Sequence, residues 1–435
     1  MNVALVFCST DKIFSEFAAG TFSTFESNPP LGLAAIGTAA LFRSCSVKIY
    51  DQTLMRKSNE ALVREILSFE PHIIGFSCTS FNLENSIECA VRLKSQSKCL
   101  VFAGGIHISL CAPQVLSRRV FDFMISGEGE EVFSEVLDSL IAGKNISSLE
   151  TPGLWHKDTG KNCGTAILKD INQPVIDRSI FPLEQYRNKG ALLEDMPCYS
   201  LFRSRGCPYR CRFCSKPSYF KIYRHRDSDN VMREIEYLID EFGAKAISFR
   251  EDNFTVNMKS LEEFCEAMIY NFGGNFFWEC ESRAELSART LTMMYKAGCR
   301  GIWCGVETVN PKWQKWINKL IPPETVAEFY DDCKNIGIKT GALFMLGFPY
   351  QTEEELKHDI DFAMRLPVSF SAFQVLALFP GSPLKGFYDS HPELCARVNE
   401  NISLALTAGM NAREMIEREH RVNIEIRSSR LNYDS

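Results

Sequence analysis

Three cysteines lie close together near the middle of the chain, in the stretch RSRGCPYRCRFCS (residues 203–215). Cys207, Cys211 and Cys214 follow the spacing CxxxCxxC, with Tyr209, Phe213 and two arginines between them. Thiolate sulfur is a ligand that zinc and iron–sulfur clusters both accept. The spacing therefore predicts a metal site with three protein ligands.

Zinc and thiol redox chemistry fit these cysteines less well than an iron–sulfur cluster does. A structural zinc site normally takes four protein ligands, and Cys198, the only other cysteine nearby, stands at a spacing unlike that of a zinc ribbon or finger. A redox motif needs two thiols, not three. Three thiolates and one open position suit a 4Fe-4S cluster whose fourth iron is left for a substrate. Tyr209 and Phe213 can shield such a cluster from water, and the arginines are either structural or raise its potential.

From about residue 196 onward, apolar runs typical of strands alternate with amphipathic segments typical of helices. The predicted strands lie in residues 246–252, 276–282, 301–308, 340–349 and 373–381, and the predicted helices in 230–242, 259–270, 288–297, 323–336 and 353–365. Six such units from the cysteine segment onward are too few for an eight-stranded barrel. We therefore expect a partial (β/α)6 barrel over residues 196–384, followed by a short, charged and solvated helical tail over 385–435.

The first 145 residues show the same alternation and predict a doubly wound parallel α/β sheet, joined to the barrel by a connecting segment over residues 146–195. Ligands of such sheets bind beyond the carboxyl ends of the strands. The residues expected there are Ser9, Thr10, Cys78, Thr79, Ser80, Gly104, Gly105, Ile106, His107, Gly127, Glu128 and Gly129. Taken singly, the glycines are explained as well by tight turns.

Composition excludes several classes of function. The chain has 435 residues, 45% of them hydrophobic, and a net charge of −6 with no long basic run, which argues against a nucleic-acid partner. The first residues, MNVALVFCST, do not resemble a signal peptide, and the longest apolar stretch is too short to span a bilayer. Most of the 17 cysteines stand alone in apolar runs, which is typical of a reducing compartment. We expect a cytoplasmic protein with no membrane partner.

The motif CPYRCRFC resembles the cluster motif of the radical S-adenosylmethionine (SAM) superfamily. Further segments match that superfamily in order: ISFREDNFT (residues 247–255), GVETVNP (305–311), FMLGFPYQTEEE (344–355) and FPGSPL (379–384). The resemblance implies a 4Fe-4S cluster on the three cysteines and SAM as a second cofactor. The residues it implies around SAM are Tyr209, Phe213, Glu251, Asp252, Arg283, Glu307, Gly347 and Pro349.

Several of these side chains have an alternative role. Glu251 and Asp252 either bind the methionyl amine or cap the helix that follows. Glu281 and Arg283 either face the site or form an ion pair. Large aromatic residues at helical spacing are more often core than cavity lining, so Tyr295, Trp303, Trp313 and Trp316 are left out of the site.

The N-terminal part resembles the cobalamin-binding domain that many members of the superfamily carry. The residues that carry the resemblance lie in 29–42, 72–82, 102–109 and 125–133. Corrinoid proteins that hold cobalt through a histidine use DxHxxG after the first strand, whereas here Asp11 is followed by Ile13 in the histidine position. His107 is more often a structural residue than a cobalt ligand in such a setting. Cobalamin is therefore expected without that histidine ligand.

The two resemblances together imply a radical enzyme that cleaves SAM to a 5′-deoxyadenosyl radical and uses methylcobalamin to methylate an unactivated carbon or a phosphorus centre. The alternative is a radical cyclisation, ring contraction or oxidation without methyl transfer. A non-catalytic carrier would have no need of the SAM-contact motifs, and a transfer-RNA methylthiotransferase would carry an extra RNA-binding domain. The expected partners are a small-molecule or peptide substrate and a one-electron donor such as flavodoxin or ferredoxin.

Overall fold

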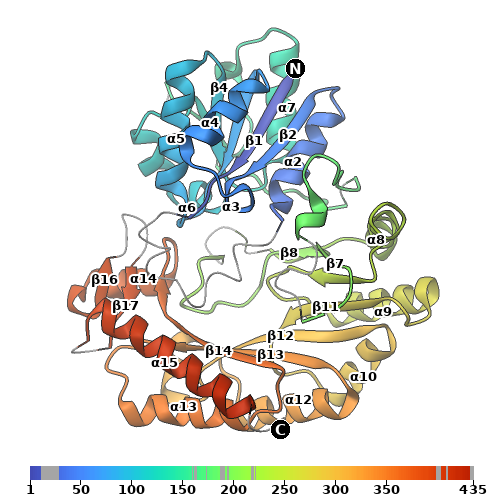
Figure 1. The fold of residues 1–435 in the computed structure, drawn as a ribbon, viewed down its shortest axis with the longest axis vertical. Helices are drawn as coiled ribbons and strands as arrows, with labels where there is room; N and C mark the ends of the chain where they lie inside the picture. The colour runs from blue at the N-terminus through green and yellow to red at the C-terminus, as the bar shows by residue number, and fades with distance from the viewer. Residues whose placement is uncertain are drawn as a thin grey trace. The chain divides into compact units, whose positions relative to one another are not determined.

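The computed structural model describes residues 1–10, 29–158, 160, 164–172, 174–186, 192–193, 195–216, 220, 222–397, 403–407 and 410–431. Contacts within the chain divide it into two compact units, and the boundary between them follows Tyr186. Each unit is built around its own six-stranded sheet (Figure 1). Asp11 and Ile13, the positions that bear on a cobalt-binding histidine, lie outside the described residues.

The first unit is a doubly wound sheet with the strand order β2-β1-β3-β4-β5-β6. The strands are β1 (Asn2–Phe7), β2 (Ser46–Asp51), β3 (Ile73–Ser77), β4 (Leu100–Gly104), β5 (Phe123–Ile125) and β6 (Leu154–His156). The first five are parallel because helices connect them, and only β6 is antiparallel. The strand sequences are continuous apolar runs because both faces of the sheet are covered.

Helices pack on the two faces of this sheet. They are α2 (Leu31–Leu41), α3 (Gln52–Met55), α4 (Asn59–Ser68), α5 (Leu83–Gln96), α6 (Ile106–Ser117) and α7 (Glu130–Ile141). Helix α2 packs against α7, and α4 packs against α5 (Figure 1). The order 2-1-3-4-5 reverses direction between β1 and β3, and ligands of such sheets bind at that switch point.

The segment expected to connect two domains lies largely inside the first unit. Strand β6 pairs with β5, and Gly127 forms a parallel bridge with Ala166. Tyr186 is buried and its hydroxyl donates to Asp51 Oδ2 at 2.6 Å. Segments of weak apolar periodicity can still belong to a core when single side chains, not a repeating face, are buried.

The second unit is a six-stranded, wholly parallel sheet whose strand order, β7-β10-β11-β12-β13-β14, follows the sequence. The strands are β7 (Cys198–Leu201), β10 (Ala246–Phe249), β11 (Phe277–Ser282), β12 (Cys299–Glu307), β13 (Lys339–Leu346) and β14 (Phe370–Val375). The connecting helices are α8 (Ser228–Phe242), α9 (Met258–Phe272), α10 (Ala288–Lys296), α11 (Pro311–Ile317), α12 (Pro323–Ile336) and α13 (Glu353–Arg365). This arrangement confirms the predicted partial (β/α)6 barrel (Figure 1).

The C-terminal segment is not simply a solvated tail, which corrects the expectation from its charged sequence. Helix α15 (Ala412–Leu431) packs on the edge strand β14. Asn423 accepts from Phe373 N–H at 2.8 Å and donates to its carbonyl at 2.9 Å, so that one side chain replaces a neighbouring strand. Glu419 accepts from Val375 N–H at 2.8 Å. An exposed edge strand invites aggregation, and α15 covers this one.

Short elements complete the second unit. A two-stranded ladder joins β8 (Ser204–Arg205) to β9 (Arg224–His225), and a small antiparallel sheet joins β15 (Ala377–Leu378), β16 (Cys395–Arg397) and β17 (Ser403–Ala405). Helix α14 (Pro383–Asp389) precedes β16. Within the part of the chain that the structure describes, no helix is long and apolar enough to cross a membrane.

Candidate functional site

The loop that carries Cys207, Cys211 and Cys214 lies beyond the carboxyl end of β7, which is where barrels of this type place their chemistry. All three side chains are partly exposed, whereas most of the other described cysteines are buried. Gly206 begins the loop with a φ of +85°, and a Cβ there would collide with the carbonyl of Ile222. Glycine is therefore required for the sharp turn into the loop.

Backbone hydrogen bonds attach this loop, at Arg212, to helices α11 and α14. Arg212 N–H donates to the carbonyl of Ile317, at the end of α11, at 2.9 Å. Leu384 N–H, in α14, donates to the carbonyl of Arg212 at 3.0 Å. Because both bonds involve the residue between two of the cysteines, helix packing fixes the conformation of the loop.

Positive charges lie near two of the three cysteine sulfurs, those of Cys211 and Cys214. Burial raises the pKa of Cys211, and the nearby ammonium of Lys319 and guanidinium of Arg283 act in the opposite direction. Burial also raises the pKa of Cys214, while the amide and side chain of Lys216 lower it. Cysteine binds iron as the thiolate, and nearby cations stabilise the negative charge of the thiolates. No group of three His, Cys, Asp or Glu side chains among the described residues is placed around a single metal ion. Three cysteines on one loop, with lysine and arginine side chains near two of them, are a ligand set that fits a 4Fe-4S cluster.

The two acidic residues after β10 have different surroundings. Glu251 is buried and accepts hydrogen bonds from the amides of Arg203 and Ser204 and from the Ser204 hydroxyl. Burial raises the pKa of Glu251 against the lowering effect of Arg203 and these bonds. Asp252 forms an ion pair with Lys216, two residues after Cys214. Glu251 thus holds the start of the cysteine loop, and Asp252 is the acidic side chain next to its end.

Glu307 and Lys319 form a buried ion pair at the end of β12. The two charged groups are 2.8 Å apart, and Lys319 Nζ also donates to the carbonyl of Gly305 at 2.5 Å. Glu307 has a φ of +67°, a left-handed conformation that is uncommon outside glycine. A Cβ at Gly305 would lie only 2.8 Å from Lys319 Nζ, so the pair folds back over a residue that must lack a side chain.

The remaining residues expected near SAM separate into exposed and packed ones. Tyr209 is 37% exposed, and the Arg283 guanidinium lies 4.2 Å from its ring centroid. Phe213 packs against the apolar cluster that contains Trp313 and Phe348. Gly347 and Pro349, after β13, are buried. Gly347 has a φ of +94° and bonds through its amide to Gln351 Oε1 at 3.1 Å.

Glu281, for which the sequence left open a place in the site or an ion pair, lies beside Trp303, which the prediction left out, on the sheet face opposite the helices. The strand register pairs Glu281 with Trp303, and both remain partly exposed between fully buried neighbours. Within the described residues, the Glu281 carboxylate accepts no hydrogen bond and forms no ion pair, and the buried Trp303 indole N–H has no acceptor. Burial raises the pKa of Glu281. Each of them is next to a buried cysteine in its strand, Cys280 or Cys304. Because neighbouring side chains of a strand point to opposite faces, this alternation is the sequence signal that could have placed both residues on the other face of the sheet. Of the other excluded aromatics, Trp313 is part of the core and Trp316 is partly buried against it.

In the first unit, the loops after β1 and β3 meet at the switch point of the sheet. Ser9, Thr10 and Thr79 are partly exposed there. Asn82 Nδ2 donates to the carbonyl of Cys8 at 3.1 Å, and Asn85 Nδ2 donates to the carbonyl of Ser9 at 3.0 Å. These two asparagines join the loops but were not predicted, because nothing in the sequence placed the start of α5 beside the end of β1.

Other residues of the predicted cobalamin edge are engaged within the unit. His107 is buried, its Nδ1 lies 2.9 Å from Ser80 Oγ, and burial lowers its pKa to about 4. The side chain of Cys78 is buried, and Glu128 accepts from Leu168 N–H at 2.6 Å. These four side chains are not open to a ligand at the edge, and His107 in particular is unsuited to reach a cobalt ion there.

The glycines of this edge serve turns in part. Gly105 and Gly127 have φ values of +96° and +95°, and a Cβ at Gly105 would lie 2.7 Å from the Cys78 carbonyl oxygen. Gly129 is buried, while Gly104 and Ile106 are partly exposed. The open part of the edge is therefore small residues, hydroxyls and backbone groups. That composition fits a large planar corrinoid that approaches the backbone closely.

Comparison with known proteins gives the same two units. Residues 201–363 match the radical SAM superfamily, and residues 23–137 match the B12 binding domain. The fold and the two matches together define an enzyme of the radical SAM superfamily with an N-terminal B12-binding domain. The chain belongs to the cobalamin-dependent radical SAM family, whose cofactors are a 4Fe-4S cluster, SAM and cobalamin.

Relatives in this family carry more than one activity in their names. The uncharacterized methyltransferase PH0819 of Pyrococcus horikoshii is 27% identical over 88% of this chain and 82% of its own length. The anaerobic magnesium-protoporphyrin IX monomethyl ester cyclase of Rubrivivax gelatinosus is 26% identical over 71% of this chain, which spans 57% of that cyclase. The radical SAM methyltransferase TsrM of Kitasatospora setae, solved with cobalamin and a 4Fe-4S cluster bound, has a TM-score of 0.78 at 16% identity, over 98% of this chain and 88% of its own. At that identity the last likeness shows the fold alone.

Proposed function

We propose that the chain is a cobalamin-dependent radical SAM methyltransferase that methylates an unactivated carbon or a phosphorus centre. The observation that carries the proposal is the presence, in one chain, of a three-cysteine loop at the end of a partial barrel and an open polar edge at the switch point of a B12-type sheet. The names of PH0819 and TsrM, both methyltransferases, support it.

The residues have separate tasks in this proposal. Cys207, Cys211 and Cys214 hold the cluster, and Ser9, Thr10, Thr79, Gly104 and Ile106 contact cobalamin. The side chains nearest to SAM are Tyr209, Phe213, Asp252, Arg283 and Glu307, with Gly347 and Pro349 shaping the strand end below them. When bound, the cofactors supply a 5′-deoxyadenosyl radical that removes a hydrogen atom and a methyl group that replaces it.

The unengaged groups on the open sheet face suit a substrate. Glu281 can accept a hydrogen bond from it, and the Trp303 indole can donate one. Because a buried polar group left unpaired is costly, these two residues favour a ligand that carries a matching donor and acceptor.

A radical cyclisation without methyl transfer is the second candidate. It is favoured by the likeness to the Rubrivivax cyclase, which is nearly as identical to this chain as PH0819 is. The two reactions share the cysteine loop and differ in the fate of the substrate radical.

One experiment separates the two candidates. The protein is purified anaerobically, reconstituted with iron, sulfide and hydroxocobalamin, and mixed with SAM and a reductant that is competent on a control radical SAM enzyme. Formation of both 5′-deoxyadenosine and S-adenosylhomocysteine supports the methyltransferase. 5′-Deoxyadenosine alone supports the second candidate, and neither product from protein with an intact cluster contradicts both.

A further inference from the structure

The cysteine loop, the end of α11 and the start of α14 are joined by hydrogen bonds in the second unit. We name the surface that these three segments form the basic flank. Besides the two backbone bonds of Arg212, the Asn318 amide donates to the carbonyl of Arg210 at 2.9 Å. The Arg212 guanidinium donates to the carbonyl of Trp316 at 3.1 Å. These bonds make the loop and α11 one surface.

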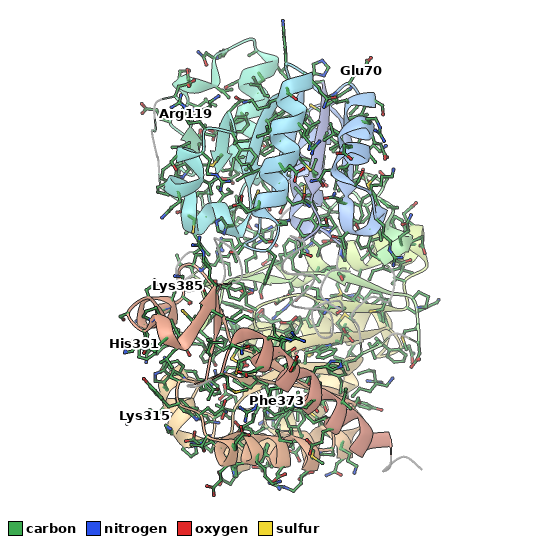
Figure 2. All side chains as sticks on the ribbon, turned by 60° about the vertical axis from the view of Figure 1, so that its left-hand side comes forward. Glu70, Arg119, Lys315, Phe373, Lys385 and His391 are labelled. Carbon is green, nitrogen blue, oxygen red and sulfur yellow. The ribbon has the colours of Figure 1, made fainter. Side chains whose placement is uncertain are left out.

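Three cations on the basic flank have no carboxylate partner among the described residues. Arg210 and Lys315 are exposed, and Arg212 lies over the Trp316 ring at 5.6 Å. Two further lysines are already paired, Lys312 with Glu355 and Lys385 with Asp389. Lys315 and Lys385 lie along the same side of the barrel unit in the view of Figure 2. The flank therefore carries an excess of about three positive charges on a chain whose net charge is −6.

The basic flank is close to the cysteines both along the sequence and through side-chain contacts. Arg210 and Arg212 stand on either side of Cys211. Phe213, beside Cys214, packs into the aromatic cluster that contains Trp316 and Phe387. These two rings are partly exposed and lie 5.7 Å apart. A protein seated on this flank is thus separated from the cluster ligands by the loop and one layer of aromatic side chains.

We propose that the basic flank is the docking surface for an acidic protein that donates one electron to the cluster. The donor loses one electron and the cluster on the three cysteines gains it, with no bond made or broken. An acidic donor is repelled by the net charge of this chain, so a local patch of opposite charge is needed to orient it. The proposal rests on the 4Fe-4S cluster alone and holds whether or not the enzyme transfers a methyl group.

The test uses the double variant Arg210→Glu/Lys315→Glu. Neither side chain makes a hydrogen bond or ion pair in the described part of the chain, so the exchange alters the surface without removing a contact. The matched control is Lys296→Glu/Lys334→Glu, two exposed lysines in the last turns of α10 and α12, which are the ends of the helices farthest from the cysteine loop. Both variants change the net charge by the same amount.

The measurement is the rate at which reduced flavodoxin bleaches the absorbance of the reconstituted cluster in a stopped-flow experiment. At 20 mM salt we expect the rate of the flank variant to fall by about tenfold or more, and that of the control to change by less than about threefold. The difference should largely disappear near 1 M salt, where the screening length is about 3 Å. Photoreduced 5-deazariboflavin, a small uncharged donor, should reduce all three proteins at the same rate.

Equal rates with flavodoxin at low salt for the flank and control variants would overturn the proposal. So would an equal loss with deazariboflavin, because that would mean that the charges act on the cluster and not on the partner. If the double variant loses iron, the single changes Lys315→Glu and Arg210→Gln carry the same test with a smaller expected effect. Failure of methyl transfer in any variant has no bearing on these rates.

Discussion

At the scale of single residues, Cys207, Cys211 and Cys214 differ from the other cysteines in what surrounds them. Cys265 and Cys333 are buried, whereas the three loop cysteines are partly exposed. Lys319 lies near Cys211, and Lys216 lies near Cys214. Burial raises the pKa of Cys211 and Cys214, and the nearby positive charges act against that effect and favour a thiolate that can bind iron.

Replacing Cys211 by Ala is therefore expected to abolish cluster binding. The iron and sulfide content after anaerobic reconstitution, and the absorbance near 400 nm, report the result. Cys395→Ala is the matched control, because Cys395 is a partly exposed cysteine of the same unit outside the loop and should keep its full iron content. A Cys211→Ala protein that retains four irons would refute the ligand assignment.

A second prediction tests whether the Glu251 carboxylate stabilises the start of the cysteine loop. Glu251→Ala removes the oxygen that accepts from the amides of both Arg203 and Ser204, so these buried donors lose their acceptor. We expect the free energy of unfolding of the apoprotein to fall by about 2 kcal/mol. Chemical denaturation measures it, with Glu263→Ala on the exposed side of α9 as the control. An unchanged midpoint would mean that the carboxylate does not support the loop.

Site residues that belong to a motif of fixed residue types and spacing can be predicted from the sequence. Site residues whose position depends on how the strands pair are harder to predict. The three cysteines are recognisable from CxxxCxxC alone. Trp303 was excluded because an aromatic residue is usually core, yet its register with Glu281 places it on the open face of the sheet. The role of Glu251 as an acceptor for Arg203 and Ser204 depends on a distance across two loops, which periodicity does not contain.

At the scale of elements, Asp359 joins α13 to the segment after β12. Its carboxylate accepts from Val309 N–H and Thr308 Oγ1, both at 2.8 Å, and burial raises its pKa to about 6. An aspartate in the unfolded chain titrates near pH 3.9. Between these values the folded protein binds more protons than the unfolded one, so this group makes stability fall as the pH rises from about 4 to about 6, with no further change above that.

Asp359→Asn should remove this contribution. The melting temperature of the wild type minus that of the variant is expected to decrease between pH 4.5 and 6.5 and to level off above pH 7. Asp361→Asn, at a partly exposed position on the same helix, serves as the control and should show no such slope. A difference that is constant over this pH range would contradict the raised pKa.

The elements themselves were largely predictable, because each barrel strand is an apolar run and each helix has an amphipathic period. The exceptions are elements whose stability comes from one neighbour. Strand β6 has three residues and pairs with β5. Helix α15 has a charged sequence in which Met415 and Ile426 are fully buried, whereas Ile424 is half exposed. The sequence therefore predicts neither strand β6 nor the packing of α15 on β14, although it does predict a helical segment at the C-terminal end.

At the scale of the whole molecule, the position of Tyr186 predicts where the chain can be divided. Ile180, Phe181 and Tyr186 are buried in the first unit, and burying such side chains contributes about 1.5–3 kcal/mol each. We expect a fragment of residues 1–186 to unfold cooperatively and to bind hydroxocobalamin. A fragment of residues 1–145, the boundary predicted from sequence, should show no cooperative transition at 25 °C. Circular dichroism against temperature measures both, and equal melting of the two fragments would place the boundary at 145.

The cover that α15 provides for β14 also sets an order of events during synthesis of the chain. Strand β14 leaves the ribosome well before Glu419 and Asn423, and at about 5–20 residues per second the delay is roughly 2–9 seconds. During that interval the amides of Phe373 and Val375 have no acceptor and the barrel ends in an open strand. Slow translation of residues 376–423 would therefore lengthen the period in which the uncovered edges of two growing chains can pair.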